Sequence, residues 1–501
     1  MDKKRMNLGR RMGAVAAAFC LLGGAMSASA SMDVSPASCY WYDANHKPVT
    51  IPDAYELSEI VELSEKTECT LTGIVDSFIA ADGTIYVLDA SGTILLLDSR
   101  YQALQTLDTL TMNGENVELN APEGLFVDAD GVIYVADTLN YRIVKLDRSG
   151  NVLRIFEQPD NLTGFDGELD YLPSKLVVDS AGRIFVVVRN VNMGIVVLDK
   201  NGQFITYRGA PSVTLSLFDL FWRRFSTQAQ RDRMTTYVPT EYNNITIDEE
   251  DFLYGTISSL SDEDLLSTIQ SNDSSGKVAP LKKLNLAGED ILRRQGMYPP
   301  VGDLAAEEKD LSSFTDVALS DCGIYTVLDA NKGRLFTYND DGELLFIFGS
   351  TGQKNDNFTR PVSLAYNGDA LLVFDGYSNR VYHFTPTAYG ELVLRAVKSY
   401  YNGDYDTSYA CWGEVLDYNS NLSLAYVGVG KAYYREGSYN EAMECFRIAG
   451  DVKQYSAAYR KVRDGLVRTY FGYLAGGVIA LAVVLILVGI VKRFKRYRDE
   501  D

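Results

Sequence analysis

The chain has 501 residues, 46% of them hydrophobic, and its 67 Asp and Glu outnumber its 47 Lys and Arg, which gives a formal net charge of -20. An acidic surface repels nucleic acid and anionic lipid, so we expect no nucleic-acid partner. The chain has only two His and lacks a Gly-x-Ser-x-Gly motif, which argues against a His-rich zinc centre and against a Ser–His nucleophile.

A targeting signal opens the chain. Five basic residues lie among the first eleven, and the apolar stretch that follows, residues 14–26, is too short to span a bilayer comfortably. Ala28-Ser29-Ala30 then matches the A-x-A pattern of a cleavage site. Residues 1–30 are therefore predicted to be a secretory signal peptide that is cleaved before Ser31.

Residues 31–70 form a predicted N-terminal arm. The arm begins with an aromatic sequence around Trp41, and Tyr55–Leu63 has the composition of an extended strand. Because an unpaired strand edge would be exposed, we predict that this strand forms the outer edge of the last sheet in the chain and so closes a ring of sheets.

Five cysteines remain after cleavage of the signal, an odd and sparse set that does not form a disulfide scaffold. Cys39 and Cys69 could close a loop. Buried single thiols are the other interpretation for this pair and the expectation for the remaining three cysteines.

A pattern of strands and tight turns recurs between residues 71 and 397. In residues 121–147, an apolar run, an Asp-Gly turn, a β-branched run, a polar loop and a third run predict three antiparallel strands. Recurrence at roughly 40–50 residues is typical of a radial array. The sequence thus predicts a mainly β fold, a six-bladed propeller, with blades at residues 74–97, 121–147, 176–198, 245–286, 317–338 and 361–384.

Residues 214–234 interrupt the repeat. Their apolar side chains follow helical spacing, with Arg223 and Arg224 off the apolar stripe, which predicts a helical insertion between the third and fourth blades. The helix either docks on the propeller or faces a partner or a membrane surface. In the second case the candidate binding residues are Phe218, Phe221, Trp222 and Phe225.

The pattern becomes helical in residues 398–468. Gly403-Asp404-Tyr405 is echoed by Gly437-Ser438-Tyr439 at an offset of 34 residues, and Trp412 maps onto Phe446 at the same offset. A repeat of this length is typical of tetratricopeptide helix pairs. Two repeats are too few for independent stability, so we expect them to pack on the propeller or on a partner.

One membrane-spanning helix is predicted at residues 469–491, followed by a basic tail at residues 492–501. Basic residues stay on the cytoplasmic side, so the sequence predicts a single-pass cell-membrane protein with its N-terminus extracellular and its C-terminus cytoplasmic. Small residues on one face of the span would allow close packing in a homodimer, and they are Gly472, Gly476 and Ala480.

The second blade resembles an NHL repeat. The residues that carry the resemblance are Pro122, Gly124, Leu125, Val127, Asp128, Gly131, Ile133, Tyr134, Val135, Ala136, Asp137, Asn140, Arg142 and Ile143, and weaker copies begin at Asp329 and Asp375. The overall layout resembles bacterial surface proteins that join an NHL propeller, a short tetratricopeptide segment and a C-terminal anchor. Such proteins are often labelled gluconolactonase-like.

A polar set in the second blade is a candidate binding site. Asp137, Asn140 and Arg142 could line one mouth of the ring, whereas a structural role would have them form turns and ion pairs. Because similar sets recur in several blades and a catalytic set would normally occur once, the structural interpretation is favoured.

Resemblance to lactonase-type propellers implies a divalent cation held by carboxylates and Asn near the axis. The composition is compatible with a Ca²⁺ site, but spacing names no ligand set, so no cofactor is predicted. The alternative function is accordingly a metal-dependent lactonase-like hydrolase that uses the propeller channel.

The favoured prediction is not an enzyme but a membrane-anchored extracellular binding or scaffold protein. Its propeller and repeat helices would hold a protein partner, for which a nutrient transporter in the membrane is a candidate by analogy. The 33 Tyr suit protein interfaces and also sugar rings, so carbohydrate is a second candidate ligand. A purely structural spacer is the third interpretation.

Overall fold

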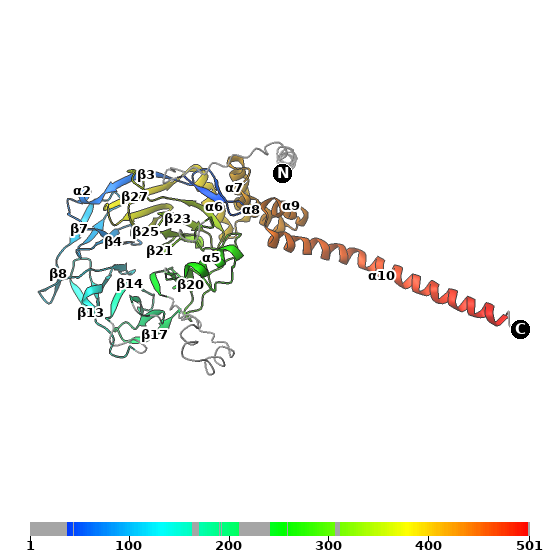
Figure 1. Cartoon of the computed structure of the whole chain (residues 1–501), viewed down its shortest axis with the longest axis horizontal. Helices are drawn as coiled ribbons and strands as arrows, with labels where there is room; N and C mark the ends of the chain where they lie inside the picture. The colour runs from blue at the N-terminus through cyan, green and yellow to red at the C-terminus, as the bar shows by residue number, and fades with distance from the viewer. Residues whose placement is uncertain are drawn as a thin grey trace. The chain divides into compact units, whose positions relative to one another are not determined.

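The structure is a computed structural model of the chain, and it describes residues 38–43, 45–162, 170–189, 191, 193–209, 241–257, 259–305 and 311–498 (Figure 1). The predicted signal peptide and the predicted helical insertion at residues 214–234 lie outside these residues.

Six antiparallel sheets form the blades of a β-propeller, which confirms the predicted fold. The first three blades are β4 (Ile74–Ile79) to β7, β10 (Gly124–Val127) to β13 and β14 (Leu172–Val178) to β17. Their remaining strands are β5 (Ile85–Asp89), β6 (Ile94–Leu97), β7 (Ala103–Leu107), β11 (Ile133–Asp137), β12 (Arg142–Leu146), β13 (Val152–Phe156), β15 (Ile184–Arg189), β16 (Ile195–Leu198) and β17 (Phe204–Arg208).

The other three blades differ from one another in strand number. The fourth has three strands, β18 (Tyr242–Ile247), β19 (Leu253–Ile257) and β20 (Leu281–Leu284), with α5 (Asp262–Ser271) between the last two. The fifth contains β21 (Phe314–Leu319), β22 (Tyr325–Asp329), β23 (Arg334–Tyr338) and β24 (Leu344–Phe348), and the sixth contains β25 (Pro361–Asn367), β26 (Ala370–Asp375), β27 (Arg380–Pro386) and β3 (Tyr55–Glu62).

The inner strands of the blades are apolar at nearly every position, on both faces of the sheet. Every residue of β5, β11 and β22 is buried, since each blade packs against a neighbour on either side. A strand covered on both faces reads as a continuous apolar run rather than as an alternating one. The first strands of consecutive blades also contact each other around the ring, and β25 contacts β4 to complete it.

The ring closes through the N-terminal arm. Strand β3 pairs antiparallel with β27, with Val61 opposite Val381, and Arg380 forms an ion pair with Glu62. After β3 comes the short helix α2 (Leu63–Thr67), whose first residue donates its backbone N–H to Asn379 O. The last blade therefore takes three strands from one end of the propeller sequence and one strand from the other.

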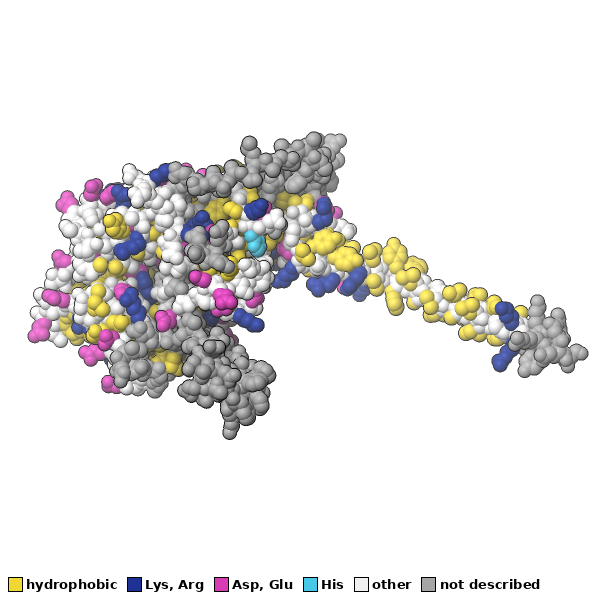
Figure 2. All heavy atoms as spheres, in the orientation of Figure 1, with side chains coloured by type: hydrophobic (Ala, Val, Ile, Leu, Met, Phe, Trp, Pro, Cys, Tyr) yellow, Lys and Arg dark blue, Asp and Glu magenta, His cyan; other side chains and the backbone are white. Residues whose placement is uncertain are grey.

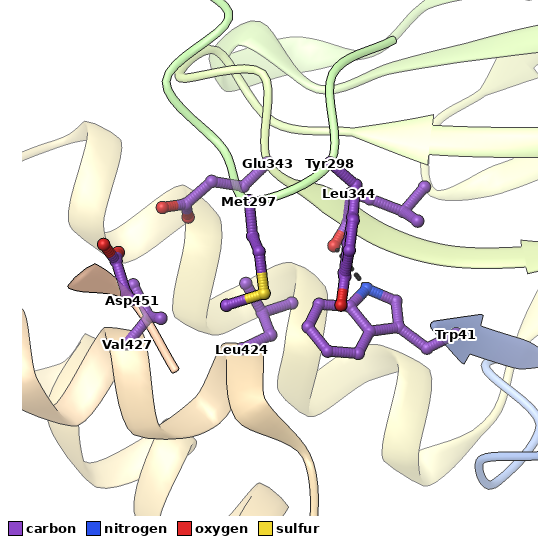
Figure 3. Close-up of a pocket in the computed structure, with 8 residues that line it drawn as sticks. All are labelled: Trp41, Met297, Tyr298, Glu343, Leu344, Leu424, Val427 and Asp451. Atoms are coloured by element: carbon purple, nitrogen blue, oxygen red, sulfur yellow. Dashed lines mark hydrogen bonds between the residues drawn. The ribbon is translucent and has the colours of Figure 1, made fainter. Parts of the chain in front are cut away.

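A second part of the arm adds to the fifth blade. β1 (Tyr40–Tyr42) pairs with β24 and with β2 (Pro48–Thr50), which extends this sheet to six strands. Figure 3 shows the contact: the Trp41 indole N–H donates to Leu344 O at 2.9 Å, while Met297 and Leu424 pack beside it. The cavity among these side chains measures about 10 Å³ and is too small for a ligand larger than water.

Helices follow the propeller in antiparallel pairs. They are α6 (Ala388–Tyr401), α7 (Tyr405–Tyr418), α8 (Ser423–Glu436), α9 (Tyr439–Ala449) and α10 (Val452–Arg498). Glycines allow the close approach, because a Cβ at Gly428 would meet the Trp412 ring at 2.3 Å and one at Gly430 would meet the Phe446 ring at 2.6 Å. The sequence placed the start of the helices ten residues too late, since β27 ends at Pro386 and α6 begins at Ala388.

Ion pairs connect the helical segment to the fifth blade. Lys431 Nζ of α8 lies 2.9 Å from Glu343 Oε1 and 3.3 Å from Asp341 Oδ2. At the start of α10, Asp451 Oδ1 accepts the Gln454 N–H at 2.9 Å and so caps the helix. Figure 3 shows Glu343 and Asp451 at this junction between the propeller and α10.

Helix α10 joins two predicted elements into one. It is continuous from Val452 to Arg498, so it includes the end of the predicted helical segment at residues 398–468 and the whole predicted span at residues 469–491. Among the described residues it is the one helix long and apolar enough to cross a membrane, with a mean hydropathy of 3.0 over a window that is not buried. Figure 2 shows hydrophobic side chains along it, with Lys and Arg near both ends of the apolar part.

The cysteines of the described chain are all free thiols. Cys39 is buried in the core cluster around the fifth and sixth blades, and Cys69 packs against a different cluster around the first blade. The possible loop closure between Cys39 and Cys69 is therefore wrong for this structure. Burial raises the pKa of the Cys39 thiol to about 12, so it stays protonated.

Candidate functional site: the axial channel

A channel of about 650 Å³ runs between the first strands of the six blades. In five blades the first strand shifts register against the second, and a polar residue follows the shift. Such β-bulges re-aim a side chain, here toward the axis. We call these five residues the axial ring: Asp76, Lys175, Asn244, Asp316 and Ser363.

Asp76 links the first three blades. Its Oδ1 lies 2.7 Å from Lys175 Nζ of the third blade, and its Oδ2 accepts the backbone N–H of Leu125 of the second blade at 2.8 Å. Both charged side chains are largely buried, with 10% of Asp76 and 14% of Lys175 exposed. Each charge is thus neutralised by the other in a setting where an unpaired charge would be costly.

Asp316 links the other three blades in the same way. It accepts hydrogen bonds from Asn244 Nδ2 of the fourth blade at 2.6 Å, from its own neighbour Val317 N at 2.8 Å and from Leu364 N of the sixth blade at 2.6 Å. Burial raises the pKa of Asp316 to about 6, and the Asp76 carboxylate adds to the shift while Lys175 opposes it.

The sixth and first blades are joined by two hydroxyls. Ser77 Oγ and Ser363 Oγ lie 2.8 Å apart and are buried. This bond joins the two carboxylate networks, so polar contacts near the axis connect all six blades. The axial ring therefore holds the blades in register as well as lining the channel.

The ring bears directly on the lactonase-like alternative. That function needs carboxylates and Asn around a cation at the axis, and Asp76, Asn244 and Asp316 do lie there. Their oxygens, however, accept from the Lys175 ammonium and from backbone amides. Within the described residues, no group of three or more His, Cys, Asp or Glu could hold a metal ion. The donor set does not fit a divalent cation, and we derive no step through one.

The mouth of the channel lies between the fourth and fifth blades. It is formed by the β18–β19 turn, by the β21–β22 connection, which contains the short 3-10 helix η2 (Asp321–Gly323), and by Tyr401 at the end of α6. Acidic residues dominate this rim, while apolar side chains line part of the channel behind it, beside the axial ring. The acidic residues are Asp248, Glu249, Glu250, Asp321 and Asp340, and the walls include Phe78, Phe126 and Val177.

The polar set of the second blade has all its members bonded within the chain. Asp137 is fully buried and accepts from Asn120 N at 2.7 Å, Asn140 Nδ2 at 2.8 Å and Arg142 Nε at 2.7 Å. Asn140 and Arg142 both donate to Glu118 O as well. These bonds connect the loop before the blade to the turn after β11, which contains the short 3-10 helix η1 (Thr138–Asn140).

Equivalent carboxylates in other blades also accept hydrogen bonds from the loops next to them. Asp89, Asp329 and Asp375 end the second strands of their blades, are fully buried and accept backbone N–H groups from neighbouring loops. Recurrence of one arrangement in four blades is what a structural role of the set would produce.

The remaining candidate residues are placed as follows. Phe218, Phe221, Trp222 and Phe225 lie outside the described residues, so their binding role stays a prediction. Gly472, Gly476 and Ala480 lie on α10, and a Cβ at either glycine would meet open space. Homodimerisation through this face also stays a prediction.

We expect Lys175→Met to destabilise the propeller by about 3 kcal/mol, because it leaves Asp76 buried without its countercharge. The double variant Asp76→Asn, Lys175→Met should recover part of this loss, since it removes the stranded charge. Urea denaturation of the full chain in detergent measures both. Equal losses in the single and double variants would contradict the ion-pair explanation.

Comparisons with known proteins assign no family to this chain. No protein-family profile and no curated protein matches the sequence. Virginiamycin B lyase of Staphylococcus aureus is similar in structure at 11% identity and a TM-score of 0.40, over 66% of this chain and 99% of that one. A Bacteroides thetaiotaomicron protein of unknown function matches at 10% identity and a TM-score of 0.41, over 68% and 80% of the two chains.

A third solved structure is the extracellular domain assigned to a hybrid two-component system, BT4673, of Bacteroides thetaiotaomicron. It matches at 12% identity and a TM-score of 0.34, over 63% of this chain and 33% of that one. The strand topology and the helices of this structure define the class by themselves: a six-bladed β-propeller followed by helices and one long apolar helix.

Proposed function

We propose that this protein is a non-catalytic binding or scaffold protein, anchored in the cell membrane by α10 with its propeller outside the cell. The propeller is of the NHL type and the helices α6–α9 act as a tetratricopeptide-like stalk. Together they hold a protein partner, for which we propose a nutrient transporter in the same membrane. Carbohydrate is the second ligand class that the aromatic content suits.

The axial ring is the observation that carries this proposal. A hydrolytic centre needs reactive groups whose bonding capacity is available to a substrate. In this structure the carboxylates of Asp76 and Asp316 are already bonded to Lys175, to Asn244 and to backbone amides of neighbouring blades. The channel consequently offers a rigid, shaped surface, which serves recognition rather than turnover.

The link between the propeller and α10 supports the membrane part of the proposal. The Lys431 side chain is 14% exposed and paired to Glu343 and Asp341 of the fifth blade. A buried, doubly paired ammonium makes the junction stiffer than a flexible linker. A stiff stalk keeps the propeller at a fixed height and orientation near the membrane, as a scaffold for a membrane complex requires.

Chemical crosslinking on intact cells, followed by mass spectrometry, tests the proposal. We expect the full chain to fractionate with membranes and to crosslink to a transporter subunit through the propeller or α6–α9. A variant ending at residue 468 serves as the control, and it should appear in the soluble fraction without that crosslink. Turnover of a lactone by the purified chain, lost on Asp316→Ala, would overturn the proposal.

A further inference from the structure

The first turns of α10 carry a charge opposite to that of the chain as a whole. Residues 452–468, which we call the basic segment, contain five Lys and Arg and one Asp, whereas the whole chain has a formal net charge of -20. Figure 2 shows Lys and Arg side chains at this end of the helix. The rule that keeps Lys and Arg on the cytoplasmic side would deplete a segment proposed to lie outside the cell, so their presence calls for another explanation.

Most of these cations have no ion-pair partner among the described residues. Arg463 is neutralised by its neighbour Asp464, whose Oδ1 lies 2.8 Å from Arg463 Nη2. Cations that attach the helices to the propeller are paired in the same way, as Lys431 is with Glu343. The other four cations of the basic segment are exposed and form no ion pair within the described part of the chain: Lys453, Arg460, Lys461 and Arg468. These four can therefore bind an anionic group outside the chain.

The helix holds these cations at fixed positions along its axis. One side of the basic segment is packed, because Ala458 is fully buried and clusters with Tyr455 and with Phe446 of α9. The helix then continues without a break into the apolar stretch, as Figure 1 shows. Each residue adds about 1.5 Å along the axis, so the distance of each cation from the membrane follows from its position in the sequence.

Aromatic residues mark where α10 enters the membrane. Tyr470, Phe471 and Tyr473 come just after the basic segment and are exposed. Such side chains gather at membrane–water interfaces, where an apolar ring and a polar tip are both accommodated. They place the membrane surface near residue 470, in agreement with the span predicted to begin at residue 469.

The distances divide the four free cations into two groups. Arg468 is next to the span and lies within the headgroup layer, which is about 5–8 Å thick. Lys461 and Arg460 lie about 12–14 Å from Thr469 along the axis, so about 4–9 Å beyond the headgroups. This gap is comparable with the Debye length of about 8 Å at physiological salt, and long side chains shorten it. Lys453 lies about 24 Å from Thr469, beyond electrostatic reach.

We propose that Arg460, Lys461 and Arg468 bind the headgroups of anionic phospholipids in the leaflet that α10 enters. This inference rests on the membrane anchorage in the proposed function and adds a lipid preference to it. Lipid is favoured over an acidic protein surface because α10 runs from these side chains directly into the apolar stretch. Headgroups therefore surround Arg468 whenever the helix spans a membrane.

Electron paramagnetic resonance of spin-labelled lipids tests the proposal on the full chain in phosphatidylcholine vesicles. Traces of spin-labelled phosphatidylglycerol or phosphatidylcholine are added, and the immobilised fraction of each measures its association with the protein. We expect wild type to prefer phosphatidylglycerol about three- to fivefold, and the triple variant Arg460→Gln, Lys461→Gln, Arg468→Gln to show about half this preference. The basic tail after the span is present in every protein compared, so its contribution cancels.

Two control variants separate position from charge. Lys453→Gln removes an equally exposed cation of the same helix that lies beyond reach of the headgroups, and it should leave the preference unchanged. Lys66→Gln, Arg100→Gln and Lys200→Gln together remove as many exposed cations from the propeller as the triple variant removes from α10, and they should also have no effect. In 1 M NaCl, where the Debye length is about 3 Å, the difference between wild type and the triple variant should become small.

Wild-type lipid preference in the triple variant, or an equal loss in the propeller control, would overturn the proposal. If the triple variant keeps its lipid preference but loses the crosslink to a membrane partner, the basic residues belong to a protein interface and the proposal is wrong. Sedimentation with the vesicles checks the anchorage separately. A chain that stays out of the vesicles would refute the proposed anchorage as well, whereas a chain that enters them without a lipid preference refutes this inference alone.

Discussion

Replacing Asp316 with Ala should destabilise the propeller by about 3 kcal/mol or more at pH 5, which would be among the largest effects of any single substitution in this chain. The change leaves the Asn244 side chain and the Val317 and Leu364 amides without their acceptor. Each buried donor left unsatisfied costs about 1–3 kcal/mol. The Asp316→Ala substitution also removes the hydrogen bonds that join the fifth blade to the fourth and to the sixth.

The effect should depend on pH in a definite direction. The folded-state pKa of Asp316 is raised to about 6, above the unfolded value near 3.9. The folded state therefore binds the proton more tightly, and this group's contribution to stability is full below about pH 4 and is lost as the pH rises through 6. The difference between wild type and Asp316→Ala should shrink between pH 4 and pH 7, by up to about 3 kcal/mol.

Urea denaturation of the full chain in detergent at several pH values between 4.5 and 7.5 measures this difference. The control is Asp130→Ala, an exposed carboxylate in the β10–β11 turn, which should change stability by no more than about 0.5 kcal/mol. A loss in Asp316→Ala that is the same at pH 5 and pH 7 would show that the raised pKa plays no part.

The blades could be predicted because their signals are local. In residues 121–147 the strands are separated by turns whose residue types favour the turn geometry, such as Gly131, which has a φ of 78°. The ring-closing strand followed from a general argument about exposed edges rather than from any motif in Tyr55–Leu63. In each case the information lay within one segment or in a rule that applies to every propeller.

Contacts between distant segments gave no such signal. Strand β1 pairs with β24 across some 300 residues of sequence, and three aromatic residues in a row do not indicate which edge they will cover. The same is true of Asp303, a loop residue that accepts the Tyr42 hydroxyl at 2.7 Å and also pairs with Arg334. Its role depends on the position of the whole fifth blade.

The axial ring had a signal that sequence analysis did not use. Each of its residues is a polar side chain two or three residues after the start of a first strand, and an apolar residue comes soon after it. Aligning Pro122-Glu123-Gly124 with Pro361-Val362-Ser363 shows that Gly124 occupies the equivalent position in the second blade. Glycine is required there, because a Cβ would come within 2.5 Å of Ser174 O.

Helices after the propeller were predicted from the helical pattern of residues 398–468, and in the structure a Cβ at Gly430 would meet the Phe446 ring at 2.6 Å. The start of α6 was missed because its first turn packs on the N-terminal arm. A Cβ at Gly390 would overlap Ala54 O at 1.8 Å, and Thr387 accepts the helix's Gly390 N–H as its cap. The start of α6 thus depends on contacts with the N-terminal arm, and the sequence around residue 388 does not indicate these contacts.

Deleting residues 38–62 should abolish folding of the propeller, the largest effect that we expect. The deletion removes β3 and leaves β27 as an open edge beside a fifth blade that has also lost β1. Tyr55 and Val61 are buried, and the Tyr55 ring stacks on Phe348 at 5.2 Å. Each such side chain contributes roughly 1.5–3 kcal/mol on burial, which together with the lost ladder approaches the 5–15 kcal/mol by which a domain is stable.

A peptide covering residues 38–67, co-expressed with the deleted chain, should restore a monodisperse species on size-exclusion chromatography in detergent. It carries the whole of β1, β2 and β3, and strand pairing needs no covalent connection to the blade that it completes. A peptide of the same composition in scrambled order is the matched control, because it lacks the register that sets Val61 opposite Val381. If the deleted chain alone unfolds cooperatively at the wild-type midpoint, the ring is held by the axial contacts and not by its N-terminal strand.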